Sequence, residues 1–373
     1  MTSQRRNRLI LVLGLLLLVL ALVWVARSAL FPFVFALVLA YVLLPLVGAF
    51  ERVIRALAPR FRGTRAVAVL ITYATMALLT FAFFSLVMPV IGRQFGALWD
   101  NRQAIISGIQ DLADQALVWY HDTTPADIQT EIDSALRQAG ARLASAVQTG
   151  IVRTVSAVTS TVSYLLGLVI VPIWLFYVLN DQSRFMRAGF QLVPDRIRPD
   201  AINIVRIADN ILSKYLRGQL VLCVVVGVLA TAGLTVLGVN SPAVLGLIAG
   251  IFEILPFVGP IIGAVPAVLV ALIQQPLLAV WTIILFFVIQ QVENAVLVPR
   301  ISGKAVELHP ALIMVVLLIG SQVAGLWGAV LAVPLTAVIR DVFKYLYLRL
   351  QDDPLDPKAA LARIGKVALQ LDV

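Results

Sequence analysis

Charged residues are scarce in this sequence, and cysteine is almost absent. Lys, Arg, Asp and Glu make up 13% of the 373 residues, about half their share in soluble domains. The single cysteine, Cys223, excludes an intrachain disulfide, and its place in an apolar run is typical of a packing residue. The two histidines, His121 and His309, fall on opposite sides of the membrane in the topology predicted below, so no metal site is expected.

Motifs of several enzyme classes are also missing. The sequence contains no G-x-x-x-x-G-K-[ST] loop, so the chain does not itself hydrolyse ATP in the manner of P-loop proteins. It has neither the H-E-x-x-H pattern of zinc proteases nor the G-x-S-x-G pattern of esterases. The sequence therefore predicts neither an enzyme nor a bound cofactor.

Long apolar runs dominate the sequence. Hydrophobic residues make up 61% of the chain, and several runs reach the roughly 20 residues that cross a bilayer. We therefore predict an all-α, polytopic integral membrane protein with about eight membrane segments, six of them full spans and two of them re-entrant hairpins. The spans are expected at 9–26, 28–50, 66–92, 151–179, 219–239 and 277–298, and the hairpins at the interrupted apolar segments 242–274 and 310–339.

The distribution of Lys and Arg sets the expected orientation. Residues 1–8 and 51–65 are basic and are predicted to lie in the cytoplasm. Residues 93–150 carry four basic and seven acidic residues and are predicted outside, whereas 180–217 carry seven basic and four acidic residues and return to the cytoplasm. Both termini are thus expected in the cytoplasm. Because the net charge of +9 lies in short segments between apolar runs, nucleic acid is not an expected partner.

The segments between the spans are predicted to be helical as well. The first apolar run is too long for a signal-peptide core, so a retained span is expected there. A helix start at Thr124-Pro125-Ala126-Asp127 indicates a small external helical subdomain, and apolar residues every three or four positions predict an amphipathic helix before residue 217. The expected parts are an N-terminal three-span region (1–92), the external subdomain (93–150), a fourth span (151–179), cytoplasmic amphipathic helices (180–217), a transport core (218–341) and a cytoplasmic tail (342–373).

The two interrupted segments resemble one another. When Pro242–Val270 is written above Pro310–Val338, both copies begin with Pro-Ala and share Ala-Val-Pro at the same offset. Each is broken in its middle, by Phe257-Val258-Gly259-Pro260 in one and by Gly325-Leu326-Trp327-Gly328 in the other. A Pro/Gly cluster inside a long apolar run predicts two half-spanning helices joined by a turn, which is a re-entrant hairpin.

The predicted topology makes these hairpins enter from opposite faces. The loop 299–309 between them, with Arg300 and Lys304, is expected in the cytoplasm. Opposed broken helices of this kind build the midplane site of secondary transporters. Eight ordinary spans are the alternative, and they place loop 299–309 outside, so labelling of a cysteine at Ser302 from outside would favour them.

Polar residues within the apolar runs are the candidates for binding a solute or an ion. A Glu253 carboxylate facing lipid would cost about 3 kcal/mol or more, so Glu253 is expected to face a cavity, a partner or a proton. Gln290, Glu293 and Asn294 share one face of span 277–298 and are predicted to line the same cavity, unless they reach the headgroup region.

The second hairpin offers a matching pair. Ser321 and Gln322 take the place of Glu253 at the constant offset of the repeat, with interhelical hydrogen bonding as the alternative role. The spacings Gly246-x-x-x-Gly250 and Gly259-x-x-x-Gly263 predict close helix packing. The expected hairpin tips and hinges are Pro256, Gly259, Pro260, Gly263, Pro266, Gly325, Gly328 and Pro334.

Five motifs give the chain a resemblance to a known family. They are Pro172-Ile-Trp-Leu-Phe-Tyr-Val-Leu-Asn-Asp181, Tyr215-Leu-Arg-Gly-Gln219, Pro256-Phe-Val-Gly-Pro260, Val298-Pro-Arg-Ile-Ser-Gly303 with Leu308-His-Pro310, and Gly325-Leu-Trp-Gly328 with Ala332-Val-Pro334. In order and spacing they resemble the autoinducer-2 exporter family of bacterial permeases, over roughly residues 10–350. The resemblance implies a bacterial inner membrane and a homo-oligomer. It also implies either export of the quorum-sensing signal autoinducer-2 or sodium (lithium)/proton antiport.

Three functions remain open at this point. We expect a secondary transporter that moves a small polar solute or a cation by alternating access. An exporter of a polar signal needs a neutral hydrogen-bonding cavity, whereas an antiporter needs titratable carboxylates at depth, for which Glu253 and Glu293 are the candidates. A membrane scaffold would show no flux and no response to Glu253→Gln, but a scaffold has no need of irregular backbone at membrane depth.

Overall fold

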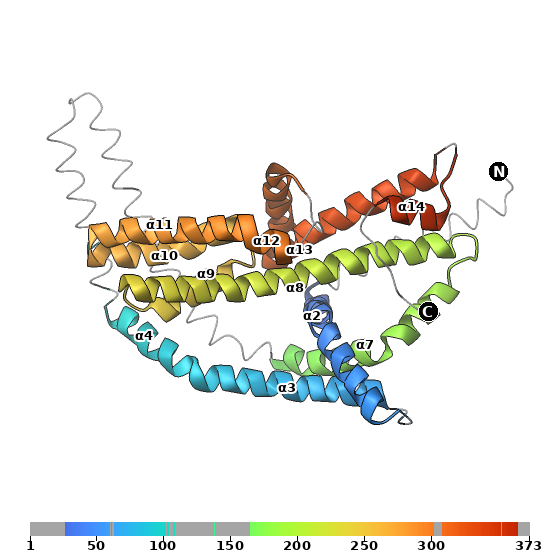
Figure 1. Cartoon of the computed structure of the whole chain (residues 1–373), viewed down its shortest axis with the longest axis horizontal. Coiled ribbons are helices and arrows are strands. Elements are labelled where there is room, and N and C mark those ends of the chain that lie inside the picture. Colours follow the sequence, from blue (N-terminus) through green and yellow to red (C-terminus); the bar gives the residue numbers. More distant parts are fainter. Residues whose placement is uncertain are drawn as a thin grey trace. The chain divides into compact units, whose positions relative to one another are not determined.

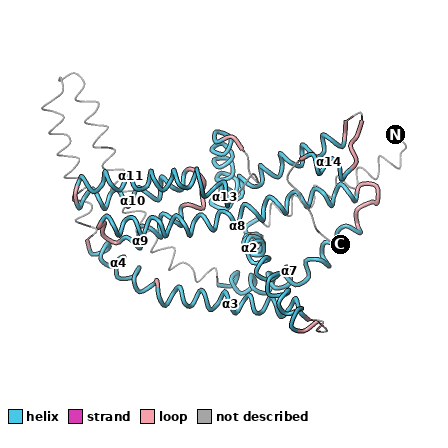
Figure 2. Tube along the Cα trace, in the orientation of Figure 1, coloured by secondary structure: helices cyan, strands magenta, loops and turns pink. Residues whose placement is uncertain are grey.

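The part of the chain that the computed structural model describes consists of helices joined by short turns and loops, without strands (Figure 1, Figure 2). This agrees with the all-α prediction. The described residues are 27–101 except 60 and 62, 165–301, and 308–364 except 352, with the single positions 103, 107, 108 and 138. The first predicted span at 9–26, most of the external subdomain 93–150, the first half of span 151–179 and Ser302 lie outside the described residues.

Five of the described helical stretches are long and apolar enough to cross a membrane. They correspond to four predicted spans and to the second interrupted segment. Two further apolar helices are shorter and fall in the first interrupted segment. The five stretches are Pro32–Leu57, Thr64–Leu86, Arg198–Leu237, Pro276–Ile301 and Pro310–Arg349.

The chain forms two compact units, and the first comprises Met1–Thr75 with Thr159–Gly189. It holds α2 (Arg27–Leu57), most of α7 (Leu165–Gln191) and the first part of α3 (Thr64–Leu86).

Polar contacts join α3 to α7 within this unit. Arg65 Nε donates to the carbonyl oxygen of Leu179 at 2.7 Å, and its Nη2 donates to Gln182 Oε1 at 2.9 Å. The Phe33 ring of α2 meets the Trp174 ring of α7 edge-on at 5.5 Å.

The second unit comprises Met76–Val158 with Phe190–Val373 and contains both interrupted segments. Helix α8 packs against α9 and α11 along its C-terminal half and against α13 and α14 along its N-terminal half (Figure 1). The elements of this unit are α4 (Met88–Asp100), α8 (Arg198–Leu237), α9 (Pro242–Phe252), α10 (Val258–Gln274), α11 (Pro276–Val292), the π-helix η2 (Glu293–Leu297), α12 (Val298–Ile301), α13 (Pro310–Arg349) and α14 (Pro357–Arg363).

Helix α8 joins two segments that the sequence analysis separated. The predicted amphipathic helix before residue 217 and the predicted span 219–239 form one uninterrupted helix of 40 residues. Its length of about 60 Å is twice the thickness of a hydrocarbon layer, so part of it must extend into water. The polarity changes near residue 218, but no proline interrupts the backbone there.

The first interrupted segment is a helical hairpin. Helix α9 has 11 residues, residues 253–257 form the turn, and α10 packs back against α9. The small residues allow this: a Cβ added at Gly263 would lie 2.8 Å from Ala249 Cα, and one added at Gly250 would lie 2.6 Å from the carbonyl oxygen of Cys223 in α8. The predicted packing role of these glycines is confirmed.

The second interrupted segment also folds back on itself. Gly320 and Gly328 would be about 12 Å apart in a straight helix. Instead, a Cβ added at either one would collide with the carbonyl oxygen of the other. The reversal occurs at Ala324 and Gly325, and Gly325 adopts φ 59° and ψ −141°, a conformation that a side chain strongly disfavours.

A side chain from α4 caps the first hairpin. Gln94 Oε1 accepts hydrogen bonds from the backbone N–H groups of Ala243 at 2.9 Å and Val244 at 3.3 Å. The hydroxyl of Ser241, which precedes α9, donates to the carbonyl oxygen of Gln94 at 3.1 Å. Because the first backbone donors of a helix lack internal partners, the Gln94 side chain supplies the capping acceptor that the N-cap residue Ser241 does not.

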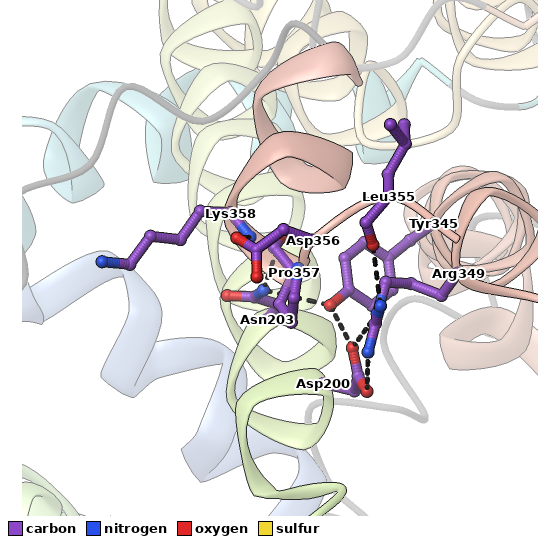
Figure 3. A network of polar contacts seen from close by, with 8 residues as sticks. All are labelled: Asp200, Asn203, Tyr345, Arg349, Leu355, Asp356, Pro357 and Lys358. Carbon is purple, nitrogen blue, oxygen red and sulfur yellow. Dashed lines mark hydrogen bonds and ion pairs between the residues drawn. The ribbon is translucent and has the colours of Figure 1, made fainter. Parts of the chain in front are cut away.

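The N-terminal end of α8 is joined to α13 by a polar network (Figure 3). The Arg349 guanidinium binds both carboxylate oxygens of Asp200, at 2.7 and 3.1 Å. The buried Tyr345 hydroxyl donates to Asp200 at 2.5 Å and accepts from Asn203 Nδ2 at 3.1 Å. Asn203 also donates to the carbonyl oxygen of Pro357, which ties α14 to the same place.

Candidate solute site

A cavity of about 490 Å³ lies among α8, α9, α10, α11 and η2. This volume is in the range of small-molecule binding sites. Most of its lining consists of Val, Ala, Ile, Leu, Phe and Pro side chains. Its three polar lining residues are Glu253, Gln290 and Glu293, all predicted as site residues from the sequence.

Glu253 occupies the point where α9 ends. Its N–H donates to the carbonyl oxygen of Ala249 at 3.0 Å, and its own carbonyl oxygen accepts from Gln219 Nε2 of α8. The residue is 1% exposed, and its Oε2 atom has no hydrogen-bond partner within the described part of the chain. The backbone of Glu253 is therefore fixed, while its side chain lines the cavity with unused hydrogen-bonding capacity.

Glu293 occupies the point where α11 changes into the π-helix η2. It is 7% exposed, and its Oε2 accepts from Gln290 Nε2 at 3.0 Å. The wider π turn interrupts the regular α-helical spacing, and such turns are frequent at functional sites. The carboxyl groups of Glu293 and Glu253 are close enough to interact electrostatically.

The other predicted binding residues are not among the residues that line this cavity. Asn294 is exposed, although it follows Glu293 directly. Ser321 is exposed, and its hydroxyl donates to the carbonyl oxygen of Leu318 in its own helix at 2.8 Å. Gln322 is exposed as well. None of the three is among the lining residues, and their role in binding stays a prediction.

The predicted tips and hinges lie at or near the two chain reversals. Pro256 lies in the turn after α9, Gly259 is buried in the first turn of α10, and Pro260 lines the cavity. Gly263 contacts Ala249, Pro266 lies inside α10, Gly325 forms the break in α13, Gly328 packs on Gly320, and Pro334 is buried in α13.

Two contributions to the site were missed by the sequence analysis. Gln219 fixes the backbone of Glu253, and its polar side chain at the start of an apolar run was a usable signal. The rings of Phe286 and Phe287 line the cavity. Because phenylalanine is common throughout apolar spans, the sequence held no signal for their role.

The titratable residues that line the cavity are acidic. Two of its lining residues are acidic, and the lining includes no Lys, Arg or His from the described residues. The described ranges also contain no group of three or more His, Cys, Asp or Glu side chains that could hold a metal ion.

Multiple apolar helices, two interrupted segments that fold back on themselves, and a solute-sized cavity are features of polytopic membrane transporters. The chain belongs to the AI-2E transporter family, whose model matches residues 13–348. This is a family of permeases rather than a class of enzymes, and it places the chain in a lipid bilayer.

Three relatives illustrate the similarity. YrrI of Bacillus subtilis (strain 168) is 34% identical over 232 residues, which cover 62% of this chain and 64% of YrrI. YueF of the same organism is 30% identical over 320 residues, or 84% of this chain and 83% of YueF. The AI-2 transport protein TqsA of Escherichia coli (strain K12) is 25% identical over 335 residues, or 89% of this chain and 90% of TqsA.

Proposed function

We propose that the chain is a gradient-driven secondary transporter whose solute passes through the α9–α11 cavity by alternating access. The observation that carries this proposal is the buried Glu253 carboxyl, which lines a cavity at a break in the helices. Discontinuous helices with irregular backbone beside a cavity are typical of transporter binding sites. The six site residues predicted from the sequence remain candidates, and three of them, Glu253, Gln290 and Glu293, support the proposal because they line the cavity.

Both helical hairpins are proposed to be re-entrant. Helix α9 is about 16 Å long, roughly half of a hydrocarbon layer, so it does not cross the membrane alone. Gln94, Ser241 and Gln274, all predicted outside, lie at one end of the first hairpin. Asp200 and Arg349, both predicted in the cytoplasm, contact each other. These contacts support a topology with both termini in the cytoplasm of a bacterial cell.

Autoinducer-2 is the first candidate solute, since the relative TqsA is named for it. The test is flux of labelled autoinducer-2 in proteoliposomes that contain the purified chain. Saturable flux that falls at least tenfold in Glu253→Gln would support the proposal. Absence of flux of this or any other solute in a folded preparation would favour the scaffold alternative.

Cation/proton exchange is the second candidate function, and the acidic pair of Glu253 and Glu293 favours it. Carboxyl groups at membrane depth mark ion pathways and proton relays. Proton movement driven by a sodium or lithium gradient in the same proteoliposomes, lost in Glu253→Gln, would identify this function. A homo-oligomer is proposed for either function on the family resemblance.

A further inference from the structure

The cavity wall has an uneven chemistry. Glu253, Gln290 and Glu293 are gathered together, because Gln290 donates to Glu293 and the two carboxyl groups interact. The rest of the wall is apolar and includes the rings of Phe286 and Phe287. A ligand that matches this wall has one polar or charged group and a larger apolar body.

The charge of the wall selects the sign of the ligand. Among the described residues, the buried Oε2 of Glu253 has no hydrogen-bond partner and the lining offers no basic side chain. An anion would meet two acidic groups without a donor of opposite charge. A neutral polyol would leave most of its hydroxyl groups against hydrocarbon, which costs free energy.

The volume of the cavity selects the size of the ligand. At about 490 Å³ it is more than ten times the roughly 30 Å³ that one water molecule occupies in the liquid. A bare sodium or lithium ion at the acidic pair would leave the apolar part of the cavity unfilled. An organic body would fill it, and the Phe286 and Phe287 rings can attract a cation through their faces.

We propose that the α9–α11 cavity binds a small organic cation with an apolar body, whose charged group pairs with Glu253 and Glu293. This inference rests on the proposed transport function and names an organic cation, in place of autoinducer-2, as the class of transported solute. The cavity rim agrees with this class. Ile261 and Phe287 are 68% and 63% exposed, so the cavity opens on an apolar face from which an amphiphilic cation can arrive through the hydrocarbon layer.

Equilibrium binding to the full chain in lipid nanodiscs tests this inference without any gradient or flux. The probes are benzyltrimethylammonium and tetraphenylphosphonium, which differ in size. Tetraphenylborate, which has the shape of tetraphenylphosphonium and the opposite charge, is the control ligand. We expect saturable binding of at least one cation and none of the borate.

Variants locate the bound cation. Binding should weaken at least tenfold in Glu253→Gln and in Glu293→Gln, and Glu253→Asp should recover part of the loss because it keeps the carboxyl group. Asp353→Asn removes an exposed carboxylate far along the chain and should bind like the native protein. Circular dichroism and gel filtration of each variant show whether it is folded.

Several results would overturn the proposal. One is the absence of saturable cation binding to folded native protein, and another is equal binding by the native chain and both Gln variants. Displacement of the probe by millimolar sodium or lithium would assign the acidic pair to an inorganic ion. A lipid that copurifies in the cavity and resists displacement would assign the cavity to the bilayer. Flux of autoinducer-2 without cation binding would refute this inference alone, whereas cation binding without any flux would refute only the transport function.

Discussion

At the scale of single residues, side chains distant in sequence hold the backbone of the first hairpin in place. Ser241 precedes α9 but does not cap it with its own side chain, and Gln94 supplies the acceptor instead. At the other end of α9, Gln219 binds the carbonyl oxygen of Glu253. The ends of the short helix are thus fixed by α4 and α8, so its geometry depends on those helices.

Gln94→Ala should destabilise the protein by about 1 kcal/mol, because the first backbone donors of α9 lose their acceptor. Gln94→Glu should retain most of the stability, since a carboxylate also accepts hydrogen bonds and suits a helix N-terminus. Thermal unfolding in detergent, followed by circular dichroism, measures the change. Gln191→Ala, at an exposed helix end, is the matched control. Equal midpoints for Gln94→Ala and this control would contradict the capping role.

Tyr345→Phe tests the network at the other end of α8. The hydroxyl of this fully buried residue links Asp200 and Asn203, and its removal should cost about 1 kcal/mol. Tyr347→Phe removes the same atom from a residue that is 61% exposed and should leave the unfolding midpoint unchanged. If both variants unfold at the same temperature, the network does not stabilise the fold.

At the scale of elements, close approach through glycine determines how α8 and α9 pack. A Cβ at Gly246 would collide with Thr231 Oγ1 and lie 2.8 Å from the carbonyl oxygen of Gly227. The backbones of α8 and α9 would have to separate to accommodate the added Cβ atom. The same residue type at Gly48 in α2 has no atom within 4 Å of an added Cβ.

Gly246→Ala should therefore destabilise the chain by about 1–3 kcal/mol through overpacking. Gly48→Ala should be neutral or stabilising by up to about 1 kcal/mol, because alanine favours a helix over glycine. Thermal unfolding of both variants in the same detergent provides the comparison. A stable Gly246→Ala with native solute flux would show that α8 and α9 are free to move apart.

The ends of the first interrupted segment were predictable because proline and glycine act locally, whereas α13 continues to Arg349, beyond the predicted end of the second segment at residue 339. The first segment was predicted at 242–274, and α9 and α10 together begin at Pro242 and end at Gln274.

The continuity of α8 was not predictable from polarity. The change from amphipathic to apolar sequence near residue 218 reflects a change of solvent along the helix, and a backbone can continue through it.

At the scale of the whole molecule, the two possible topologies differ in the side of the membrane on which loop 299–309 lies. The re-entrant topology places Arg300 in the cytoplasm and Asn240 outside, whereas eight ordinary spans place both outside. Because Cys223 is the only cysteine in the sequence, Cys223→Ala gives a background without thiols.

In that background, Asn240→Cys should react with a membrane-impermeant maleimide added to intact cells, and Arg300→Cys should react only after the membrane is opened. Asn240 is exposed at the turn before α9 and serves as the positive control for both topologies. Labelling of Arg300→Cys in intact cells would refute the re-entrant arrangement and leave the cavity chemistry unaffected.

The acidic site residues that the sequence predicted were found from the free energy of placing a carboxyl group in lipid. Glu253 and Glu293 are carboxyl groups in apolar runs, and the free energy of exposing them to lipid required a cavity or a partner. Ser321 and Gln322 were chosen by alignment of the two hairpins instead. The repeat describes where the backbone reverses and not what surrounds it, so it gave no information on which side chains reach the cavity.

The π-helix η2 accommodates one extra residue between α11 and α12. A π turn holds one more residue than the α-helical turn that it replaces. Loss of one residue from Asn294–Leu297 would restore regular α-helical winding, and because four α-helical residues turn about as far as five π-helical residues, α12 would keep its orientation relative to α11. The winding would therefore absorb the deletion of a single codon here, whereas the same deletion within α11 would rotate the residues that follow by about 100°.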